Sequence, residues 1–367
     1  MPYTPPLRIL LTGAGAPGAW GIISALRAAA DRRIVIVGVD MRRDAVGFAR
    51  CDRVHVVPAA TSPEFWAAMR EILLAERIHV IVPLVTRELE ILASRRCEIE
   101  CLGVRAVVSD PEALSLANDK GRTTEAIREA GLPAPRAKVV HSADGLRRAA
   151  GELGYPGVPV VVKPCQSNGS RGVRILDPTI DRLHLLLHEK PSSLISTLDD
   201  VAGILEGADP FPPYVVMEYL PGEEYSVDCL ADGERALVVV PRRRDEIRQG
   251  ISFAGTVVYD EEIVTYSRSI VERLRLWGPI GLQVRRDAAG AAKLIEINPR
   301  LQGTTALSVA AGVNLPWLSV RLALGESFSV GPIAWGTRVI RYWGDTFWSA
   351  DGRLLSDGTG GTAGPAS

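Results

Sequence analysis

The sequence predicts a mixed α/β and α+β protein, and three observations lead to that expectation. Across roughly the first 110 residues, short apolar strands alternate with helical patterns, which implies a parallel sheet with helices on both faces. Further along the chain, strands dominate and several of them resemble hairpins. The chain has 367 residues, and at about 100–200 residues per domain this length suggests two or three domains.

The first region supplies the alternating elements. The expected strands are Leu7–Thr12, Arg33–Asp40, Val54–Pro58, Ile78–Pro83 and Val104–Ser109. The expected helices are Ala19–Ala30, Pro63–Glu76, Glu88–Arg95 and Asn118–Ala130. Asp110 followed by Pro111 marks a further helix start, because a capping side chain and an early proline are typical of a first turn.

The second region is richer in strands. The expected strands are Val158–Lys163, Val173–Leu176, Tyr214–Tyr219, Glu224–Ala231 and Ala236–Pro241, with a last hairpin of Gly281–Arg286 and Lys293–Asn298. The expected helices are Ile263–Trp277, Thr304–Ala311 and Pro316–Leu324. The tail Ser356–Ser367 consists mostly of small and polar residues with little to bury, so we expect it to be disordered.

The charge balance and the cysteines limit the class of protein. Lys plus Arg number 42 and Asp plus Glu 43, so the formal net charge is −1. This balance argues against nucleic acid as the main partner, because duplex binding needs a basic excess. No apolar run approaches the ~18–20 residues of a membrane span, and the N-terminus lacks the order of a signal peptide. An odd number of cysteines without CxxC spacing favours a reducing cytoplasm.

A glycine-rich loop follows the first expected strand. Gly13-Ala-Gly-Ala-Pro-Gly18 matches GxGxxG between a strand and a helix, and Asp40 ends the next strand. That context fits a dinucleotide site and hence an NAD(P)-dependent oxidoreductase. The same glycines would also expose N–H groups to a carboxylate at a helix N-terminus, or serve close packing alone. The loop by itself leaves these alternatives open.

The last hairpin is expected to gather polar side chains. Alternation along the strand puts one set on one face, namely Leu294, Glu296, Asn298 and Arg300, and puts Ile295 and Ile297 on the other. A turn between Ala288 and Ala291 pairs position i with roughly 579 − i, which places Gln283 opposite Glu296. Amide and carboxylate oxygens are hard ligands that suit Mg²⁺ held between protein and phosphates. Arg300 just beyond them suits a phosphate or a developing oxyanion.

These motifs together give a resemblance to a known family. Ile295-Glu-Ile-Asn-Pro-Arg300, with the upstream Gln283, resembles the metal-binding segment of ATP-grasp enzymes, closest to the carbamoyl-phosphate-synthase-like branch. The resemblance implies a Rossmann-like pre-ATP-grasp domain followed by a two-lobed ATP-grasp fold. The implied boundaries are 1–115 for the first domain, 116–213 for the N-lobe with its lid and glycine-rich loop, 214–348 for the C-lobe, and 349–367 for a disordered tail.

The resemblance also implies where ATP binds. The residues that match the nucleotide-binding motifs of the family are Lys120, Lys163, Gly169, Ser170, Gly172, Glu218, Tyr219, Leu220 and Glu224. The two lysines match the phosphate-binding lysines, and the glycines and the serine lie in the flexible phosphate loop. Glu218, Tyr219 and Leu220 lie on the hinge strand that contacts adenine in this family. Glu224 matches the glutamate that binds ribose.

The metal and substrate residues follow from the same resemblance. Gln283, Glu296 and Asn298 match the ligands of Mg²⁺ or Mn²⁺. The expected catalytic residues are Arg300, Arg244 and Arg248, the last two chosen to hold a substrate carboxylate bidentately. The substrate is expected to contact Gly15, Glu88, Asp228 and Ser252.

The expected function is an ATP- and Mg²⁺-dependent ligase that joins a carboxylate to an amine through an acyl phosphate. A single ATP-grasp unit without a glutaminase region argues against carbamoyl phosphate synthesis itself, so a stand-alone ligase fits better. The alternatives are the oxidoreductase, an acyl kinase that stops at the acyl phosphate, and a nucleotide-binding regulator without turnover. The expected partners are small carboxylates and amines in the cytoplasm, with neither nucleic acid nor a membrane, and a homodimer is left open.

Overall fold

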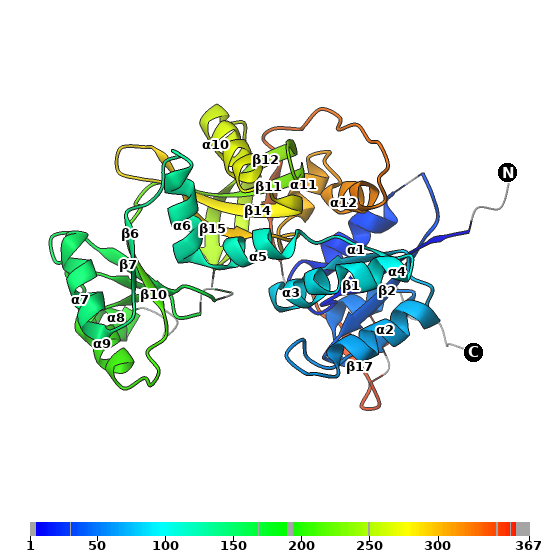
Figure 1. Ribbon diagram of the computed structural model, residues 1–367, viewed down its shortest axis with the longest axis horizontal. Helices are drawn as coiled ribbons and strands as arrows, with labels where there is room; N and C mark the ends of the chain where they lie inside the picture. The colour runs from blue at the N-terminus through cyan, green and yellow to red at the C-terminus, as the bar shows by residue number, and fades with distance from the viewer. Residues whose placement is uncertain are drawn as a thin grey trace.

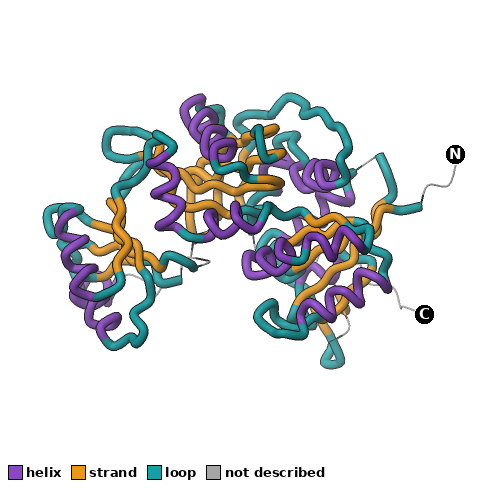
Figure 2. The backbone as a smooth tube through the Cα atoms, viewed as in Figure 1, coloured by secondary structure: helices purple, strands orange, loops and turns teal. Residues whose placement is uncertain are grey.

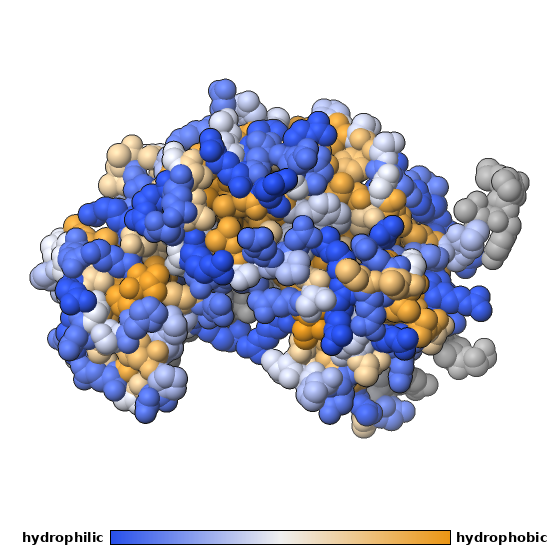
Figure 3. Space-filling model, in the orientation of Figure 1, coloured by the Kyte–Doolittle hydropathy of each residue, from blue (hydrophilic) through white to orange (hydrophobic). Residues whose placement is uncertain are grey.

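The structure is a computed structural model that describes residues 5–29, 31–167, 169, 171–188, 194–248, 250–342, 344–352 and 354–356. Ser170 and residues 357–367 of the expected tail lie outside the described residues. Figure 1 shows an arch, in which the N-terminal domain and a small lobe form the two sides and a large lobe joins them at the top. Figure 2 shows a separate sheet in each part, and in Figure 3 the surface is hollowed between the two sides.

The N-terminal domain has the expected parallel sheet. Its strand order is β3-β2-β1-β4-β5, and the pairings are parallel. The strands are β1 (Leu7–Thr12), β2 (Ile34–Asp40), β3 (Arg53–Val56), β4 (Val80–Pro83) and β5 (Arg105–Ala106). The helices are α1 (Ala19–Arg27), η1 (Val46–Arg50), α2 (Phe65–Ala75), α3 (Thr86–Ser94), α4 (Arg96–Cys101) and α5 (Pro111–Asn118). Apolar strand residues face cores on both sides of the sheet, as the uninterrupted apolar runs predict.

The small lobe comprises residues 137–218. Its sheet has the order β6-β10-β7-β8-β9. The strands are β6 (Ala137–Val140), β7 (Val160–Pro164), β8 (Arg174–Leu176), β9 (Ile195–Ser196) and β10 (Tyr214–Glu218), and the helices are α7 (Ala143–Glu152), α8 (Arg182–His188) and α9 (Leu198–Glu206). The sequence analysis predicted no helix between residues 137 and 218, whereas α7 and α9 cover one face of the sheet. A capping side chain precedes each helix. The hydroxyl of Ser142 accepts the N–H of Gly145, and that of Thr197 accepts the N–H of Asp200, in each case the third residue of the helix.

The large lobe comprises residues 224–340. Its sheet has the order β15-β14-β11-β12-β13-β16. The strands are β11 (Glu224–Asp232), β12 (Ala236–Arg248), β13 (Ile251–Val257), β14 (Trp277–Arg286), β15 (Ala292–Asn298) and β16 (Arg338–Ile340), and the helices are α10 (Glu261–Arg273), α11 (Ala306–Ala310) and α12 (Leu315–Ala323). Helix α6 (Lys120–Glu129) packs on this lobe, since Ile127 shares a core with Leu282 and Ile270.

The N-terminal domain and the large lobe share one apolar core. Ile9 and Ile23 of the first domain belong to the same buried cluster as Val238, Leu307 and Trp317 of the large lobe. Burial of this kind contributes about 25 cal/mol per Å² of apolar surface. The junction of these two parts is therefore a packed interface, which can hold residues from both parts in fixed positions.

Two boundaries differ from the sequence prediction. The helix expected over Ile263–Trp277 ends at Arg273, because Arg275 adopts a left-handed φ of 50° and Trp277 begins β14. Strand β12 also continues past the expected Pro241 to Arg248, through the run of arginines, because it pairs with β13 along that length.

The hairpin of β14 and β15 confirms the predicted register and corrects one part of it. Gln283 pairs with Glu296 as predicted, but Val284 pairs with Leu294, so Ile295 is the extra residue of a β-bulge. The bulge reverses the alternation before Glu296. Leu294 is therefore buried in the core beside Ile297, and the prediction that it shares the face of Glu296 is wrong.

The end of the described chain returns to the N-terminal domain. Strands β17 (Phe347–Trp348) and β18 (Leu354–Ser356) pair antiparallel, and β18 lies within 349–367, the region expected to be a disordered tail. Trp348 packs against a small cluster of Ala14, Ala45 and Phe48. In the described part of the chain, no helix has the length and apolar character needed to cross a membrane.

Candidate active-site cleft

A cleft of about 660 Å³ lies where the N-terminal domain meets the large lobe. Its wall includes Gly13, Asp40, Thr86 and Glu88 from the first domain, Gly169 and Arg171 from the phosphate loop, and Ser226, Arg244, Ser252, Gln283, Glu296, Asn298 and Arg300 from the large lobe. A hollow of about 20 Å³ shares part of this wall and reaches Lys120 and Ser167. The cleft thus brings together seven of the polar residues that the sequence singled out, namely the three candidate metal ligands, Glu88, Arg244, Ser252 and Arg300.

Two buried lysines lie near Glu296, and one of them, Lys120, lines the small hollow. Lys120 and Lys163 are 7% and 5% exposed. The Nζ of Lys120 donates to the carbonyl of Ser167 at 3.0 Å and lies 4.0 Å from Oε2 of Glu296. Burial lowers the pKa of Lys163 to about 8, an effect that Glu296 opposes and the charge of Lys120 reinforces. Two buried cations facing one carboxylate leave positive charge for an anionic ligand.

The β-bulge of β15 supplies a partner for Lys163. The Nζ of Lys163 donates to the carbonyl of Ile295 at 3.2 Å, and Ile295 is the residue that the bulge leaves unpaired. The irregular strand therefore connects a lysine of the small lobe to the segment that carries Glu296. This link was beyond the sequence prediction, which assumed a regular strand.

The three candidate metal ligands occupy neighbouring positions of the cleft. Gln283 and Glu296 face each other across the hairpin, and Nδ2 of Asn298 donates to Oε1 of Glu296 at 3.0 Å. Among the described residues, no group of three or more His, Cys, Asp and Glu side chains is arranged to hold a metal. One carboxylate with two amide oxygens still fits Mg²⁺, which takes oxygen ligands and usually completes its shell with substrate phosphates and water.

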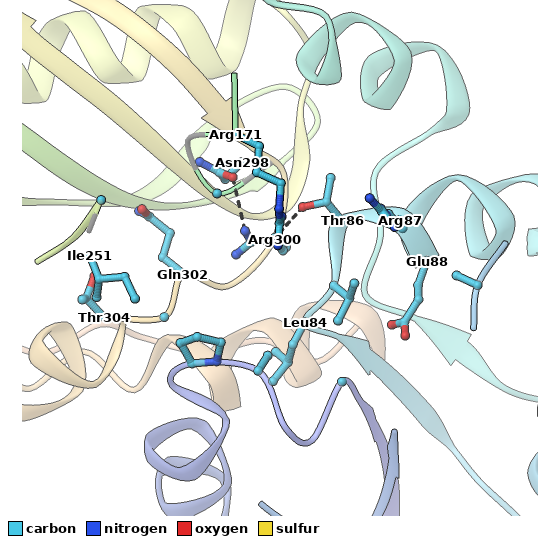
Figure 4. Close-up of a pocket in the computed structure, with 18 of the residues that line it drawn as sticks. Leu84, Thr86, Arg87, Glu88, Arg171, Ile251, Asn298, Arg300, Gln302 and Thr304 are labelled. Atoms are coloured by element: carbon cyan, nitrogen blue, oxygen red, sulfur yellow. Dashed lines mark hydrogen bonds between the residues drawn. The ribbon is translucent and has the colours of Figure 1, made fainter. Parts of the chain in front are cut away.

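Arg300 links this site to the N-terminal domain. Its Nε donates to Thr86 Oγ1 at 3.0 Å, its Nη1 to the carbonyl of Leu301 at 2.9 Å and its Nη2 to Asn298 Oδ1 at 3.3 Å. Burial lowers the pKa of this guanidinium, and Glu296 partly opposes the effect. Figure 4 shows Arg300 between Asn298 and Thr86, at the boundary of the two parts.

The two other expected arginines have different surroundings. Arg244 lines the cleft, and its guanidinium pairs with Glu224, donates to Ser252 Oγ at 2.8 Å and to the carbonyl of Gly250 at 2.7 Å. Arg248 is exposed, pairs with Glu246 at 2.7 Å and lies over the ring of Phe253. Arg248 does not belong to the described wall of the cleft.

The hinge residues lie at the junction of the two lobes. Glu218 accepts the backbone N–H of Arg136 at 3.0 Å and Nζ of Lys293 at 2.6 Å. Burial would raise the pKa of Glu218, but these hydrogen bonds outweigh it and lower the pKa. Tyr219 lies 5.5 Å from the guanidinium of Arg285, and the next residue, Leu220, is buried. The carboxylate of Glu218 therefore joins the small lobe to β15.

The glycines of the phosphate loop have distinct roles. Gly169 lines both hollows. Gly172 has a φ of 75°, and a Cβ there would lie 2.6 Å from Cγ of Pro164, so the turn excludes other residues. Ser170 between them lies outside the described residues.

Asp228 lies beneath the cleft, where it is fully buried. It pairs with Arg242 at 2.8 Å and accepts from Gln302 Nε2 at 3.1 Å and Ser308 Oγ at 2.6 Å. The structure places Asp228 outside the described wall, whereas its partner Gln302 lines the cleft. Asp228 therefore holds the turn that follows Arg300.

The glycine-rich loop is bonded within the first domain and packed against the large lobe. The N–H of Gly15 donates to Oδ2 of Asp40 at 2.7 Å, so this loop amide is already bonded. At Gly18, the start of α1, a Cβ would lie 2.4 Å from the carbonyl of Gly303. The glycine at this position therefore serves a close backbone approach, and the oxidoreductase alternative gains no support. Gly15 itself does not belong to the described wall, whereas Gly13 does.

Glu88 is the buried acid of the N-terminal side. It is 8% exposed, lines the cleft and accepts a hydrogen bond from the hydroxyl of Thr12. Burial raises the pKa of Glu88 to about 7; the Thr12 hydrogen bond opposes this and the nearby Asp40 adds to it. Figure 4 shows Glu88 on the same side of the cleft as Leu84 and Thr86.

Sequence reasoning missed other residues of the wall, including Gln302, Thr304 and Arg171. Gln302 and Thr304 follow Arg300 in the turn that contacts α1, and both are buried. The signal available was Gly303 between them, since a glycine in a turn often marks a close backbone approach.

Comparison with known proteins adds an independent finding. A family model for an ATP-grasp domain in the biosynthetic pathway with the Ter operon matches residues 210–341, and a model for a PylC-like N-terminal domain matches residues 9–107. The chain is 32% identical over 255 residues to the carbamoyl phosphate synthase large chain of Rubrobacter xylanophilus, which covers 64% of this chain and 22% of that one. The chain spans about a fifth of the length of the curated relatives it matches.

Solved structures show the same fold at low identity. An ADP complex of N5-carboxyaminoimidazole ribonucleotide synthetase has a TM-score of 0.66 and 18% identity, covering 92% of this chain and 81% of its own. The biotin carboxylase domain of the Hydrogenobacter thermophilus 2-oxoglutarate carboxylase, a dimer with MgADP and bicarbonate, has a TM-score of 0.65 and 18% identity, covering 90% and 72%. The L-amino acid ligase of Bacillus licheniformis has a TM-score of 0.61 and 16% identity, covering 88% and 75%. At these identities the structural likeness shows the fold, and together with the matched models it establishes that this chain carries an ATP-grasp domain behind a PylC-like N-terminal domain.

Proposed function

We propose that this chain is an ATP- and Mg²⁺-dependent ligase that joins a carboxylate to an amine and releases ADP and phosphate. One observation carries the proposal. Lys120, Glu296, Asn298 and Arg300 form a continuous row from the small hollow into the cleft, through contacts of 4.0, 3.0 and 3.3 Å. Such a row can hold a triphosphate at one end and a carboxylate at the other.

The reaction balances in two steps. A carboxylate oxygen attacks the γ-phosphorus of ATP, the bond from that phosphorus to the β–γ bridging oxygen breaks, and ADP leaves. The amine nitrogen then attacks the acyl carbon and loses a proton, and the carbon–oxygen bond to phosphate breaks. In such phosphoryl transfers the protein contributes alignment and charge stabilisation more than covalent chemistry.

We assign each role to residues in or beside the cleft. Lys120 and Lys163 offer charge to the phosphates, while Arg300 stabilises the oxygens that gain charge during transfer. Gln283, Glu296 and Asn298 would hold Mg²⁺, which when bound neutralises and bridges phosphate oxygens. Glu218, Tyr219 and Leu220 would contact the adenine and Glu224 the ribose, and Ser252, beside Arg244, would contact the substrate.

The similar proteins support this proposal. Solved structures of the same fold contain ADP or MgADP, and one is an L-amino acid ligase. A homodimer is part of the proposal, with the biotin carboxylase domain dimer in its support. A cytoplasmic location is also part of the proposal, because all five cysteines are free thiols, as a reducing compartment would keep them.

The test is ADP release from Mg·ATP in the presence of pooled amino acids, which offer both carboxylates and amines. The wild type should release ADP above background, and Glu296→Ala should lose both this release and most of the affinity for Mg·ATP. Glu100→Ala, which removes an exposed acid of α4, should match the wild type in both. Absence of release together with wild-type binding of Mg·ATP by Glu296→Ala refutes the proposal. Release that does not require an amine would instead indicate an acyl kinase.

A further inference from the structure

The guanidinium of Arg300 is held by three neutral acceptors. Its Nη1 donates to the carbonyl of Leu301 at 2.9 Å and its Nη2 to Oδ1 of Asn298 at 3.3 Å, both on its own segment of the chain. Its Nε donates at 3.0 Å to Oγ1 of Thr86, which lies 214 residues away in the N-terminal domain. Because a guanidinium is a planar fork of N–H groups, these contacts set the direction in which its remaining N–H groups point.

The contact with Thr86 is the closer of the two side-chain contacts. Its distance of 3.0 Å is typical of an N–H···O hydrogen bond, whereas the 3.3 Å to Asn298 lies beyond the usual range. The amide oxygen of Asn298 is also a candidate ligand of Mg²⁺, a role that Thr86 does not share. The hydroxyl of Thr86 therefore stays available to Arg300 whether or not the metal site is in use.

Packing fixes both ends of this hydrogen bond. Thr86 is the first residue of α3, two positions after Leu84, and Arg300 directly precedes Leu301. Leu84 and Leu301 belong to the same buried cluster, the core that the N-terminal domain shares with the large lobe. Threonine is branched at Cβ, so few rotamers are open to its hydroxyl. Packed elements therefore set the distance between Thr86 and Arg300, and charge stabilisation depends on such preorganised donors.

We infer that Thr86 is a positioning residue, whose hydroxyl orients Arg300 toward the oxygens that gain charge during phosphoryl transfer. Thr86 lines both the cleft and the small hollow, and Figure 4 shows the hydrogen bond that joins it to Arg300. The inference rests on the proposed ligase function, to which it adds a role for the N-terminal domain in the chemistry itself. Without the hydroxyl the guanidinium is free to turn away, and misplacement by about 1 Å can cost about 100-fold in rate.

The experiment compares two substitutions that differ in the hydroxyl. Thr86→Val removes it and nearly keeps the shape of the side chain, whereas Thr86→Ser keeps it. The control is Thr337→Val, because the hydroxyl of Thr337 donates to the carbonyl of Ala334 at 2.7 Å and Thr337 does not belong to the described wall of either hollow. ADP release is measured against the concentration of Mg·ATP with pooled amino acids, and melting temperatures check that each variant folds. Thr86→Ala takes the place of Thr86→Val if that variant does not fold.

Thr86→Val should lower kcat about 10- to 100-fold, the usual cost of losing a hydrogen bond to a charged group. The KM for ATP should stay unchanged, because a loss confined to kcat marks an interaction that acts in the transition state. Thr86→Ser, which keeps the hydroxyl, and Thr337→Val should each keep kcat within about 3-fold of the wild type. A wild-type kcat in Thr86→Val, an equal loss in Thr86→Ser, or a loss that appears only in KM overturns the inference and leaves the ligase intact.

A measurement on Arg300 itself separates this inference from the proposed function. In ligand-free protein labelled with nitrogen-15 in its arginines, the Nε–H signal of Arg300 is identified by its absence in Arg300→Lys. The hydrogen bond to Thr86 should protect this proton from exchange in the wild type, Thr86→Ser and Thr337→Val, and Thr86→Val should lose the protection. If no protein releases ADP, the proposed function fails and this signal alone decides. That pattern upholds the positioning, whereas an unprotected proton in the wild type, or a protected one in Thr86→Val, overturns it.

Discussion

The buried carboxyl of Glu88 should make the stability of the ligand-free protein depend on pH. Its pKa rises from 4.5 to about 7 because burial disfavours the charged form, so the folded state holds a proton that the unfolded state has lost. Stability from this group is complete below pH 4.5 and is lost as the pH rises through 7. The shift of about 2.5 units corresponds to roughly 3 kcal/mol at 1.36 kcal/mol per unit. Glu88→Gln cannot ionise and should keep that stability.

Urea unfolding at several pH values between 4.5 and 8.5 measures the effect. The difference in free energy of unfolding between Glu88→Gln and the wild type should grow by up to about 3 kcal/mol across this range and level off above pH 7.5. Glu90→Gln, on the exposed side of the helix, should show a difference that changes by less than about 0.5 kcal/mol. A difference for Glu88→Gln that stays constant with pH would refute the reasoning from burial.

Three further substitutions test other parts of the account. Lys163→Met should weaken Mg·ATP binding about 10- to 100-fold in calorimetry. In the nucleotide-free protein it should raise the free energy of unfolding in urea by about 1–3 kcal/mol at pH 7. The reason is that burial lowers the pKa of Lys163 to about 8, so its charge destabilises the folded state. Arg244→Ala should lower the free energy of unfolding by about 1–3 kcal/mol, since the half-buried Glu224 loses its nearer cation and keeps only Arg285 at 3.9 Å. Exposed Arg248→Ala should cost less than about 1 kcal/mol. Gly18→Ala should lower the melting temperature more than Gly131→Ala. Both glycines have a positive φ, but only at Gly18 would a Cβ meet backbone, 2.4 Å from the carbonyl of Gly303. Equal losses would contradict the docking of the large lobe on α1.

The parts of the fold that local rules govern could be predicted from the sequence. Apolar runs between helical patterns predict the parallel sheet, because such strands are buried on both faces. Pairing across the short turn places Gln283 opposite Glu296, because hairpin register follows from turn position. The bulge at Ile295 was not predictable in the same way, since its reason is a contact with Lys163, which lies 132 residues away in the chain.

The residues of the candidate site could be predicted where a sequence motif indicates their chemistry. They could not be predicted where contacts between distant parts of the chain decide which side chains reach the cleft. The sequence offered two equivalent arginines for the substrate, and pairing with β13 sends Arg244 into the cleft and Arg248 to the surface. The glycine-rich loop fitted a dinucleotide site, whereas in the structure Gly303 packs against Gly18. Helices α7 and α9 were missed although Ser142 and Thr197 mark their starts, because short helices between strands carry a weak periodic signal.

The central claim is that a carboxylate oxygen attacks the γ-phosphorus of ATP. The most direct test is to incubate the protein with Mg·ATP and pooled amino acids labelled with oxygen-18 in their carboxyl groups, and to analyse the inorganic phosphate by mass spectrometry. If the carboxylate attacks, each phosphate released carries one atom of oxygen-18, because the bridging oxygen of the acyl phosphate leaves with phosphorus. Phosphate released without the label would show that ATP is cleaved by water and would contradict the account.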